Sequence, residues 1–433
     1  MDHAGESNSE QRTLPPRNGM PRTLRASRPD PEAWPLLRIS NLFVGNPERF
    51  ALSRIRRIWK YAAWALGGRM PVSAVREREI DGPSGPVRIR IYRPTNSQEP
   101  CPGFVWFHGG AFMVGGIDTA DPICRHIAQV SGAAVVAVQY RLAPEHDLYA
   151  GREDGLAAVS WINRNGPSIG IDGSRIAVGG DSAGGNIAAA IAQEWVRRGE
   201  PALRLQVLVY PATNLVDEFP SLKENARGYL ITAESINWIK GVLGKFNGRD
   251  VWLSPAYNEN WTGLAPALIL TAGFDPIRDD GLAYAQRLRD EGIPVELLHY
   301  PGQFHGFVNF DAILRTSRDA LHRIATSLAG ALEARADDAP NRTIEIGPRG
   351  AVRQTLLSDL FVASLLAGEW AERKRDRLFG QLWPWPVPRA VRKLKFVTSP
   401  ATTARHHLAY RYAKLEARET YNVSVESSTR KSP

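Results

Sequence analysis

Ser182 stands in the stretch Gly-Asp-Ser-Ala-Gly-Gly, between two segments of different character. The apolar run 175–179 before it is typical of a buried strand, and the alanine-rich run 186–192 after it is typical of a helix. A serine on so sharp a turn is strained and exposed, and Gly180 and Gly184 leave room where a Cβ would strike neighbouring elements. The helix N-terminus also favours developing negative charge. We interpret Ser182 as an activated nucleophile.

A second segment supplies hydrogen-bond donors for such a nucleophile. The apolar run 103–107 predicts a buried strand, which leads directly into His-Gly-Gly-Ala at 108–111. Glycines after a central strand let backbone N–H groups turn toward the serine, and a tetrahedral oxyanion requires such donors. We expect the amides of Gly109, Gly110 and Ala183 to form an oxyanion hole.

An acid and a base follow later in the chain. Asp275 comes after a strand predicted at 266–273, and His305 comes after the next strand, 295–300. The order serine, aspartate, histidine, each after a strand, is that of a serine hydrolase on an open α/β sheet. We therefore expect Ser182, His305 and Asp275 to form a catalytic triad.

These motifs together resemble the hormone-sensitive-lipase-like carboxylesterases, a branch of the α/β-hydrolase superfamily. The resemblance covers residues 72–333, with Ala111 in place of a common glycine as a known variant. The stretches that carry it are His108–Ala111, Tyr140–His146, Gly180–Gly185, Tyr210–Pro211 and Asp275–Asp279. The resemblance implies hydrolysis of short- to medium-chain acyl esters through an acyl-enzyme, with no metal or organic cofactor.

Other titratable residues near the motifs have structural interpretations. Asp279 is expected to be the N-cap of a helix over 280–290 rather than the catalytic acid. Asp181, beside the nucleophile, is expected to point away from it. Three histidines are expected to brace the fold rather than transfer protons: His108, His146 and His299.

The order of elements predicts an α/β-hydrolase fold, with a mostly parallel, doubly wound sheet of eight strands and helices on both faces. An antiparallel pair is expected at one edge. The strands are expected at 72–80, 87–92, 104–107, 134–139, 176–179, 205–210, 267–271 and 295–300, and helices at 120–130, 151–165, 186–197 and 281–291.

Three regions of the chain are distinguished. Residues 1–70 are assigned to an N-terminal extension with cap helices, and residues 71–334 to the catalytic domain, interrupted by a cap insertion at about 212–262. The insertion lies where an open α/β sheet binds ligand. Cap helices are sought within Leu36–Leu66 and Leu222–Phe246. Residues 335–433 form a basic C-terminal extension that the resemblance does not explain.

Charge is distributed unevenly among the regions. Residues 1–80 contain 14 basic residues (Lys or Arg) and 8 acidic residues (Asp or Glu). The corresponding numbers are 22 basic and 27 acidic in residues 81–334, and 18 basic and 10 acidic in residues 335–433. In the extension, an apolar helical pattern at 355–371, tryptophans and the cations of 389–395 suit a peripheral membrane anchor. The alternative is that this helical segment packs onto the catalytic body or onto a second subunit of a homodimer. This alternative is favoured because amphipathic helices face a protein core more often than a membrane.

Composition agrees with a large protein that buries a sizeable core: the 433 residues are 43% hydrophobic. No signal peptide or membrane-spanning stretch is recognised, and Cys101 and Cys124 are expected to be free, as in the cytoplasm. No nucleic-acid-binding module accompanies the basic residues, so the expected partner is a small acyl ester. An amidase or lipase role at a membrane, and a non-catalytic ligand-binding role, are the alternatives.

Overall fold

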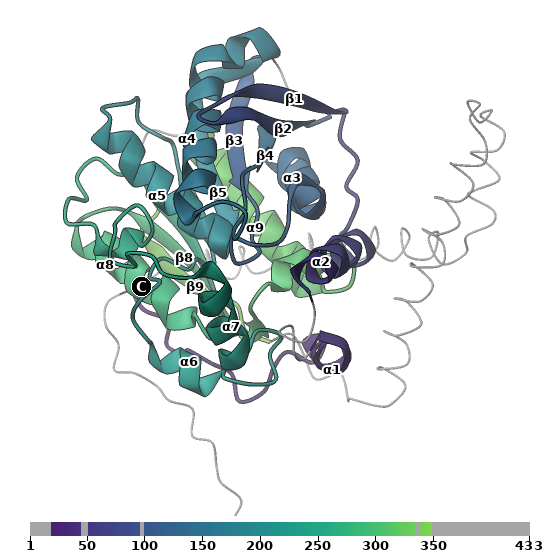
Figure 1. The fold of residues 1–433 in the computed structure, drawn as a ribbon. Coiled ribbons are helices and arrows are strands. Elements are labelled where there is room, and N and C mark those ends of the chain that lie inside the picture. The colour runs from purple at the N-terminus through teal and green to yellow at the C-terminus, as the bar shows by residue number, and fades with distance from the viewer. Residues whose placement is uncertain (1–18, 45–50, 96–98, 334–337, 349–433) are drawn as a thin grey trace, which may run out of the picture. The chain divides into compact units, whose positions relative to one another are not determined.

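A computed structural model of the chain describes residues 19–44, 51–95, 99–333 and 338–348. Its centre is a twisted sheet of nine strands in the order β1-β2-β4-β3-β5-β6-β7-β8-β9 (Figure 1). β1 (Ala74–Gly82) and β2 (Gly85–Arg93) form an antiparallel hairpin at one edge, and β2 is antiparallel to β4 (Ala134–Gln139). All remaining neighbours are parallel.

The parallel strands are apolar on both faces, because helices cover both. Besides β4, the central parallel strands are β3 (Cys101–Phe107), β5 (Ile171–Asp181), β6 (Gln206–Val209), β7 (Ala267–Phe274) and β8 (Val295–Phe304), and every residue of β6, β7 and β8 is buried. All eight predicted strands are therefore present. The α/β-hydrolase fold expected from the sequence is confirmed, with one strand more than predicted.

The additional strand is β9 (Arg342–Glu345), which runs parallel to β8 at the other edge of the sheet. Residues 335–433 were assigned to an extension outside the catalytic body, and this part of them belongs to the sheet. The run Arg-Thr-Ile-Glu is short and half polar, so nothing in its own periodicity marks it as a strand.

Two helical layers enclose the sheet and divide the core in two. One layer contains α4 (Leu148–Asn165), α5 (Ala183–Arg197) and α8 (Arg278–Asp290); the other contains α3 (Ile117–Ser131) and α9 (Arg315–Glu333). The sequence analysis had not assigned α9. Short 3₁₀ turns occur at Gly166–Ile169, Pro255–Tyr257 and Phe307–Phe310.

Four helices lie outside these layers (Figure 1). α1 (Ala33–Val44) and α2 (Leu52–Leu66) come from the N-terminal region, and α6 (Pro220–Glu224) and α7 (Ala233–Leu243) come from the insertion between β6 and β7. Both segments in which cap helices were sought are thus helical. The apolar pattern at 355–371 and the basic run at 389–395 lie outside the described residues.

Candidate active site

Ser182 occupies the turn between β5 and α5, with φ 56° and ψ −117°. This left-handed conformation is strained for a serine and costs on the order of 1–3 kcal/mol, so the surroundings must impose it. Gly180 and Gly184 make it possible. A Cβ on either glycine would strike the carbonyl oxygen of Phe107 at the end of β3. The predicted strand-turn-helix arrangement around Ser182 is therefore present.

The two other predicted catalytic side chains reach the serine from neighbouring loops. His305 follows β8 and Asp275 follows β7. His305 Nε2 lies 2.9 Å from Ser182 Oγ, and His305 Nδ1 lies 2.7 Å from Asp275 Oδ2. Asp275 is fully buried and His305 is 4% exposed. Hydroxyl, imidazole and carboxylate are thus in hydrogen-bond contact in series.

The carboxylate of Asp275 determines which imidazole nitrogen faces the serine. Its Oδ1 accepts the backbone N–H of Ile277 at 2.8 Å, which fixes the carboxyl plane, and its Oδ2 faces Nδ1 of His305. An ionised carboxylate only accepts, so Nδ1 carries the proton and Nε2 keeps its lone pair for the hydroxyl of Ser182. This is the tautomer that a general base requires.

The loop after β3 approaches the serine with unusual backbone angles. Gly110 has φ 123°, and Ala111 and Phe112 have φ 53° and 62°. Among the described residues, neither the amide of Gly110 nor that of Ala183 donates a hydrogen bond. Both are therefore available to an oxyanion.

Gly109 differs from the expectation. Its N–H donates to Oδ1 of Asp181 at 2.8 Å, so it is already engaged within the fold. A Cβ on Gly109 would also collide with that carboxylate. Gly109 thus anchors the loop to Asp181, and the amides of Gly110 and Ala183 are the expected donors that remain.

Two of the three histidines that were expected to brace the fold, His108 and His299, are buried against other elements. His108 stacks on Tyr140, with ring centroids 4.3 Å apart, and burial lowers its pKa to about 4. His299 lies inside β8, between Thr271 Oγ1 and the carbonyl of Leu24, and burial likewise lowers its pKa to about 4. His146 is exposed. None of the three contacts Ser182.

Two acidic residues near Asp275 differ from it in environment. Asp279 was predicted as a helix N-cap, and this was wrong: α8 begins at Arg278, two residues before the predicted start, and Asp279 accepts from Ser221 N at 2.9 Å. Asp280 is buried and accepts from Thr213 Oγ1 at 2.5 Å, and burial raises its pKa to about 7.

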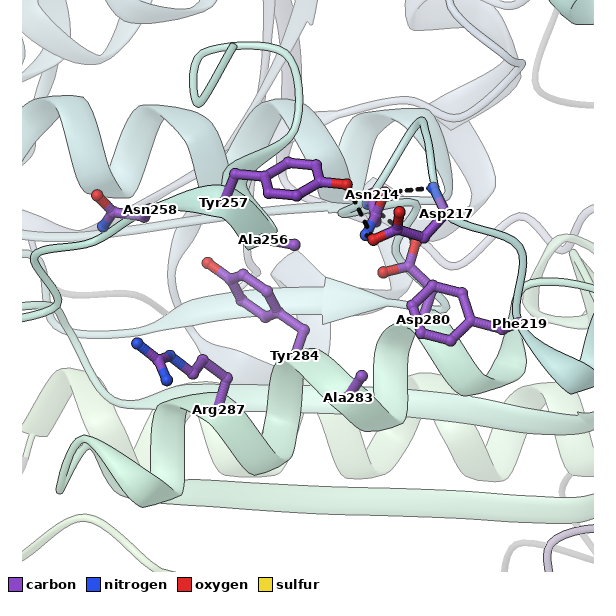
Figure 2. A pocket seen from close by; sticks show the side chains of 10 residues that line it. All are labelled: Asn214, Asp217, Phe219, Ala256, Tyr257, Asn258, Asp280, Ala283, Tyr284 and Arg287. Carbon is purple, nitrogen blue, oxygen red and sulfur yellow. Dashed lines mark hydrogen bonds between the residues drawn. The ribbon is translucent and has the colours of Figure 1, made fainter. Parts of the chain in front are cut away.

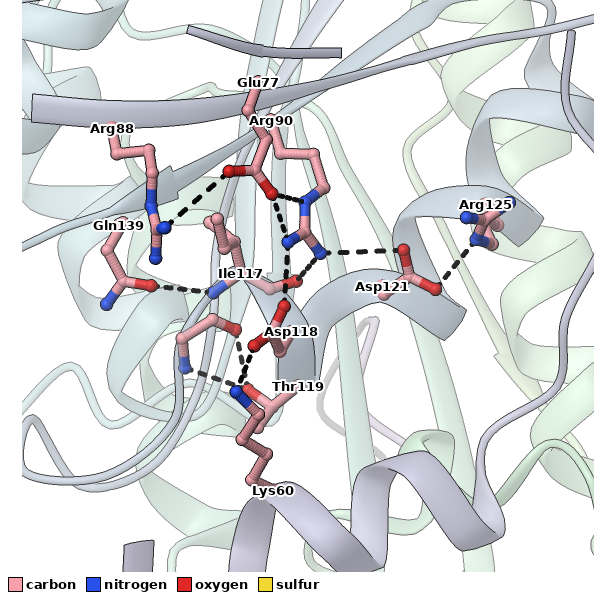
Figure 3. A network of polar contacts seen from close by, with 11 residues as sticks. Lys60, Glu77, Arg88, Arg90, Ile117, Asp118, Thr119, Asp121, Arg125 and Gln139 are labelled. Atoms are coloured by element: carbon pink, nitrogen blue, oxygen red, sulfur yellow. Dashed lines mark hydrogen bonds and ion pairs between the residues drawn. The ribbon is translucent and has the colours of Figure 1, made fainter. Parts of the chain in front are cut away.

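A network of polar contacts surrounds the start of α3, which follows the loop after β3 (Figure 3). Arg90 of β2 bonds Asp118 at 2.8 Å, and Lys60 of α2 reaches the same carboxylate at 2.5 Å. One turn earlier in α2, Arg56 donates to the carbonyl of Met113 at 2.7 Å and pairs with Glu145. Helix α2 thus contacts the middle of the loop that follows β3, at Met113, and the first turn of α3, at Asp118.

A cavity of about 390 Å³ lies apart from these residues, between the start of the insertion and α8 (Figure 2). The carboxylate of Asp280 at its wall is already occupied by Thr213. It contains none of the predicted site residues; its lining residues are Asn214, Asp217, Phe219, Ala256, Tyr257, Asn258, Asp280, Ala283, Tyr284 and Arg287.

Asn309 is a site residue that the sequence analysis missed. Its Nδ2 lies 3.4 Å from Asp181 Oδ2 and 3.2 Å from the carbonyl of Gly306, so it connects the histidine loop to the residue beside the nucleophile. An asparagine four residues after a histidine carries no signal of this. Within the described ranges, no group of three or more His, Cys, Asp or Glu side chains could hold a metal ion.

Comparison with known proteins identifies the family. An α/β-hydrolase family model matches residues 104–309. Esterase LipI of Mycobacterium tuberculosis is 40% identical over 259 residues, which are 58% of this chain and 81% of the relative. Carboxylesterase NlhH of the same organism is 39% identical over 273 residues, 61% of this chain and 85% of the relative. The chain belongs to this α/β-hydrolase family, and the resemblance to the hormone-sensitive-lipase-like carboxylesterases is confirmed.

Solved structures agree with this assignment. An esterase from the archaeon Pyrobaculum calidifontis matches with a TM-score of 0.64 and 36% identity, over 69% of this chain and 98% of that one. An ester hydrolase from the metagenome of Lake Arreo matches with a TM-score of 0.67 and 35% identity, over 70% and 99%. The protein is a carboxylesterase-type serine hydrolase. No helix in the described part of the chain is long and apolar enough to span a membrane.

Proposed function

We propose that the protein hydrolyses short- to medium-chain acyl esters with Ser182 as nucleophile, His305 as general base and Asp275 as its orienting acid. The observation that carries this proposal is the unbroken contact series from Ser182 Oγ to His305 Nε2 (2.9 Å) and from His305 Nδ1 to Asp275 Oδ2 (2.7 Å). Each of the three side chains lies within hydrogen-bond distance of the group with which the mechanism requires it to share a proton.

Acylation begins when Ser182 Oγ bonds to the ester carbonyl carbon while its proton passes to His305 Nε2. The carbonyl π electrons move to oxygen, where the amides of Gly110 and Ala183 donate to the negative charge. The intermediate collapses by breaking the bond to the alkoxy oxygen, which takes the proton from His305 and leaves as the alcohol. Asp275 stabilises the imidazolium in between.

Deacylation repeats these steps with water. His305 takes a proton from the water whose oxygen bonds to the acyl carbon, and then returns it to Ser182 Oγ as the acyl–oxygen bond breaks. The products are the carboxylic acid and the unmodified enzyme. Each proton that His305 accepts is returned within the same half-reaction, so the cycle requires only ester and water.

The preference for short or medium acyl chains rests on similarity. A relative from Pseudomonas putida, 35% identical over 245 residues, is named ethyl acetate hydrolase, and this chain covers 77% of it. Tyr229 of the insertion packs on Phe274, the residue before Asp275, with ring centroids 4.9 Å apart, and Leu230 packs against the same core cluster. Apolar side chains from the insertion beside the acid loop are suited to a small acyl or alkoxy group.

The test is a p-nitrophenyl ester series from acetate to palmitate, measured on wild type and Ser182→Ala. We expect the highest kcat/KM at short or medium chains and a loss of at least ~10³ in kcat for the variant, because removal of the nucleophile ends covalent catalysis. Stoichiometric labelling of wild type alone by a fluorophosphonate would identify the residue. Full turnover by Ser182→Ala would reject Ser182 as the nucleophile. Rates on an amide and a thioester with the same acyl group would measure whether the enzyme also hydrolyses those bonds.

A further inference from the structure

A segment upstream of the hydrolase body runs along β8 on its way to the histidine loop. Residues 22–32, here called the N-terminal strap, begin at β9, where Thr23 N donates to the carboxylate of Glu345 at 3.1 Å. The carbonyl of Leu24 then accepts from His299 Nε2 at 2.9 Å. These contacts attach the strap to the last two strands of the sheet.

The strap continues along the end of β8 that leads to the catalytic base. Ala26 N donates to the carbonyl of Pro301 at 2.9 Å, and Asp30 N donates to the carbonyl of Gly302 at 2.7 Å. His305 follows three residues later. The backbone that delivers the base is therefore held by two main-chain hydrogen bonds from residues far away in sequence.

Arg25, in the same strap, reaches toward the other catalytic loop. Its Nη1 donates to the carbonyl of Glu224 at 2.8 Å and to Oδ1 of Asn225 at 3.2 Å. Its guanidinium carbon lies 4.7 Å from the centroid of Phe274 and 5.7 Å from that of Tyr229. Phe274 immediately precedes Asp275. A planar guanidinium suits this role because it stacks and donates at the same time.

Asn225 completes the connection to the acid. It is fully buried, and its Nδ2 donates to the carbonyls of Asp275 at 3.0 Å and Gly273 at 3.2 Å. Its Oδ1 accepts from Arg25. One amide side chain from the insertion therefore links the strap to the main chain of the catalytic acid, while the carboxylate of Asp275 faces His305.

We propose that Asn225 and Arg25 are positioning residues for Asp275, and that the strap aligns the acid loop with the base loop. Neither residue touches the reacting atoms: Asn225 sets the position of the Asp275 backbone, and Arg25 sets the orientation of Asn225. The inference rests on the proposed function, because it assigns a role relative to the triad. Arg278 Nη1 also donates to Gly273 at 3.3 Å, so loss of Asn225 loosens the loop without releasing it.

The effect has a definite sign in the pH profile. The Asp275 carboxylate stabilises the imidazolium form of His305, so a looser contact in the variant favours the neutral imidazole. Since the base must be neutral to act, the acid limb of kcat/KM then moves to lower pH. Asn225→Ala changes no charge, so a shift of this limb reports the acid–base contact.

The experiment measures p-nitrophenyl acetate hydrolysis against pH for wild type and Asn225→Ala, with rates divided by active sites titrated with a fluorophosphonate. We expect kcat per active site to fall about 10- to 100-fold at a KM within about threefold of wild type, and the acid limb to move to lower pH. Arg25→Lys, which keeps the charge but loses the planar fork, should lose less than Arg25→Ala. The matched control is Arg28→Ala, an exposed arginine of the same strap, which should match wild type.

An Asn225→Ala enzyme with wild-type kcat per active site and an unmoved acid limb would overturn the proposal, whatever its yield or melting temperature. If Arg25→Ala and Arg28→Ala lose equal activity, the strap acts only through general stability and the role of Arg25 is rejected. Failure of the proposed function is distinguishable, because Ser182→Ala would then keep its activity.

Discussion

The backbone N–H of Gly109 donates to Oδ1 of Asp181 across 2.8 Å, and this bond joins the oxyanion loop to the residue next to the nucleophile. Asp181 is 6% exposed, and its Oδ2 lies 3.4 Å from Nδ2 of Asn309, four residues beyond the base. One buried carboxylate, from the position next to Ser182, thus contacts both the loop after β3 and the segment that follows His305. Its two oxygens face Gly109 and Asn309.

Asp181→Ala should therefore damage catalysis without removing a catalytic group. The Gly109 amide loses its acceptor, and displacement of the loop by about 1 Å is enough to cost roughly 10²-fold in rate. We expect kcat for p-nitrophenyl acetate to fall 10- to 100-fold. Asp181→Asn keeps an oxygen for Gly109 and should recover most of the loss. Equal kcat for Asp181→Ala and wild type would show that the loop holds its position unaided.

Two glycine substitutions test the geometry of the serine turn. A Cβ on Gly184 would meet the carbonyls of Phe107 and His108, which are backbone atoms that cannot rotate away. Gly184→Ala should therefore abolish turnover or prevent folding, as measured by circular dichroism and ester hydrolysis. Gly330 in α9 is exposed with no atom near its Cβ position. Gly330→Ala should keep full activity and gain about 0.5–1 kcal/mol of stability. If Gly184→Ala were an active enzyme, a Cβ would fit at that position and the steric explanation would be wrong.

The contact series of Ser182, His305 and Asp275 was predictable because each of these residues follows a strand in a local motif. Ser182 lies in a six-residue pattern whose glycines have a steric reason, and Asp275 and His305 follow successive buried strands. Parallel strands bring their carboxyl ends to one edge of the sheet, so the convergence follows from the order of elements. The sequence analysis therefore placed these three side chains correctly in contact.

The supporting contacts were not predictable in this way. Asn225 and Asp275 are 50 positions apart, and Arg25 and Asn225 are 200 apart. Such polar residues are common, and only the folded backbone decides which of them meet. The same holds for Gly109, since its amide faces Asp181 rather than the serine. β9 was missed because pairing with β8, and not its own composition, makes it a strand.

Acid should destabilise the protein through its buried histidines. Burial lowers the pKa values of His108, His126 and His299 to about 4, below the ordinary value of 6.5. Between these two values the unfolded chain protonates its histidines while the folded protein does not. The free energy of unfolding is therefore at its full value above about pH 6.5 and decreases as the pH falls toward 4. We expect the Tm to drop over this range.

His299→Gln tests one contribution. At ~1.4 kcal/mol per pKa unit, the fully buried imidazole of His299 lowers the free energy of unfolding by on the order of 3 kcal/mol between pH 6.5 and 4. The variant should melt lower than wild type at pH 7 but show a flatter decline with acid. His146→Gln, at an exposed position, serves as the control and should keep the wild-type slope. An unchanged slope in His299→Gln would assign the acid sensitivity to other groups.

The boundary between the body and the C-terminal extension can be located by truncation. β9 covers the edge of β8, Ile346 N donates to the carbonyl of His299 at 2.8 Å, and Arg342 pairs with buried Glu296 at 2.6 Å. A chain ending at residue 348 should keep its Tm within a few degrees and its hydrolysis of p-nitrophenyl acetate. A chain ending at 340 exposes the β8 edge and leaves Glu296 without its cation, so it should aggregate or melt several degrees lower. Equal stability of the two would show that β9 contributes nothing to the body.

Liposome flotation of the full chain and the 348-residue chain, at low and high salt, would then test whether the basic extension binds anionic membranes.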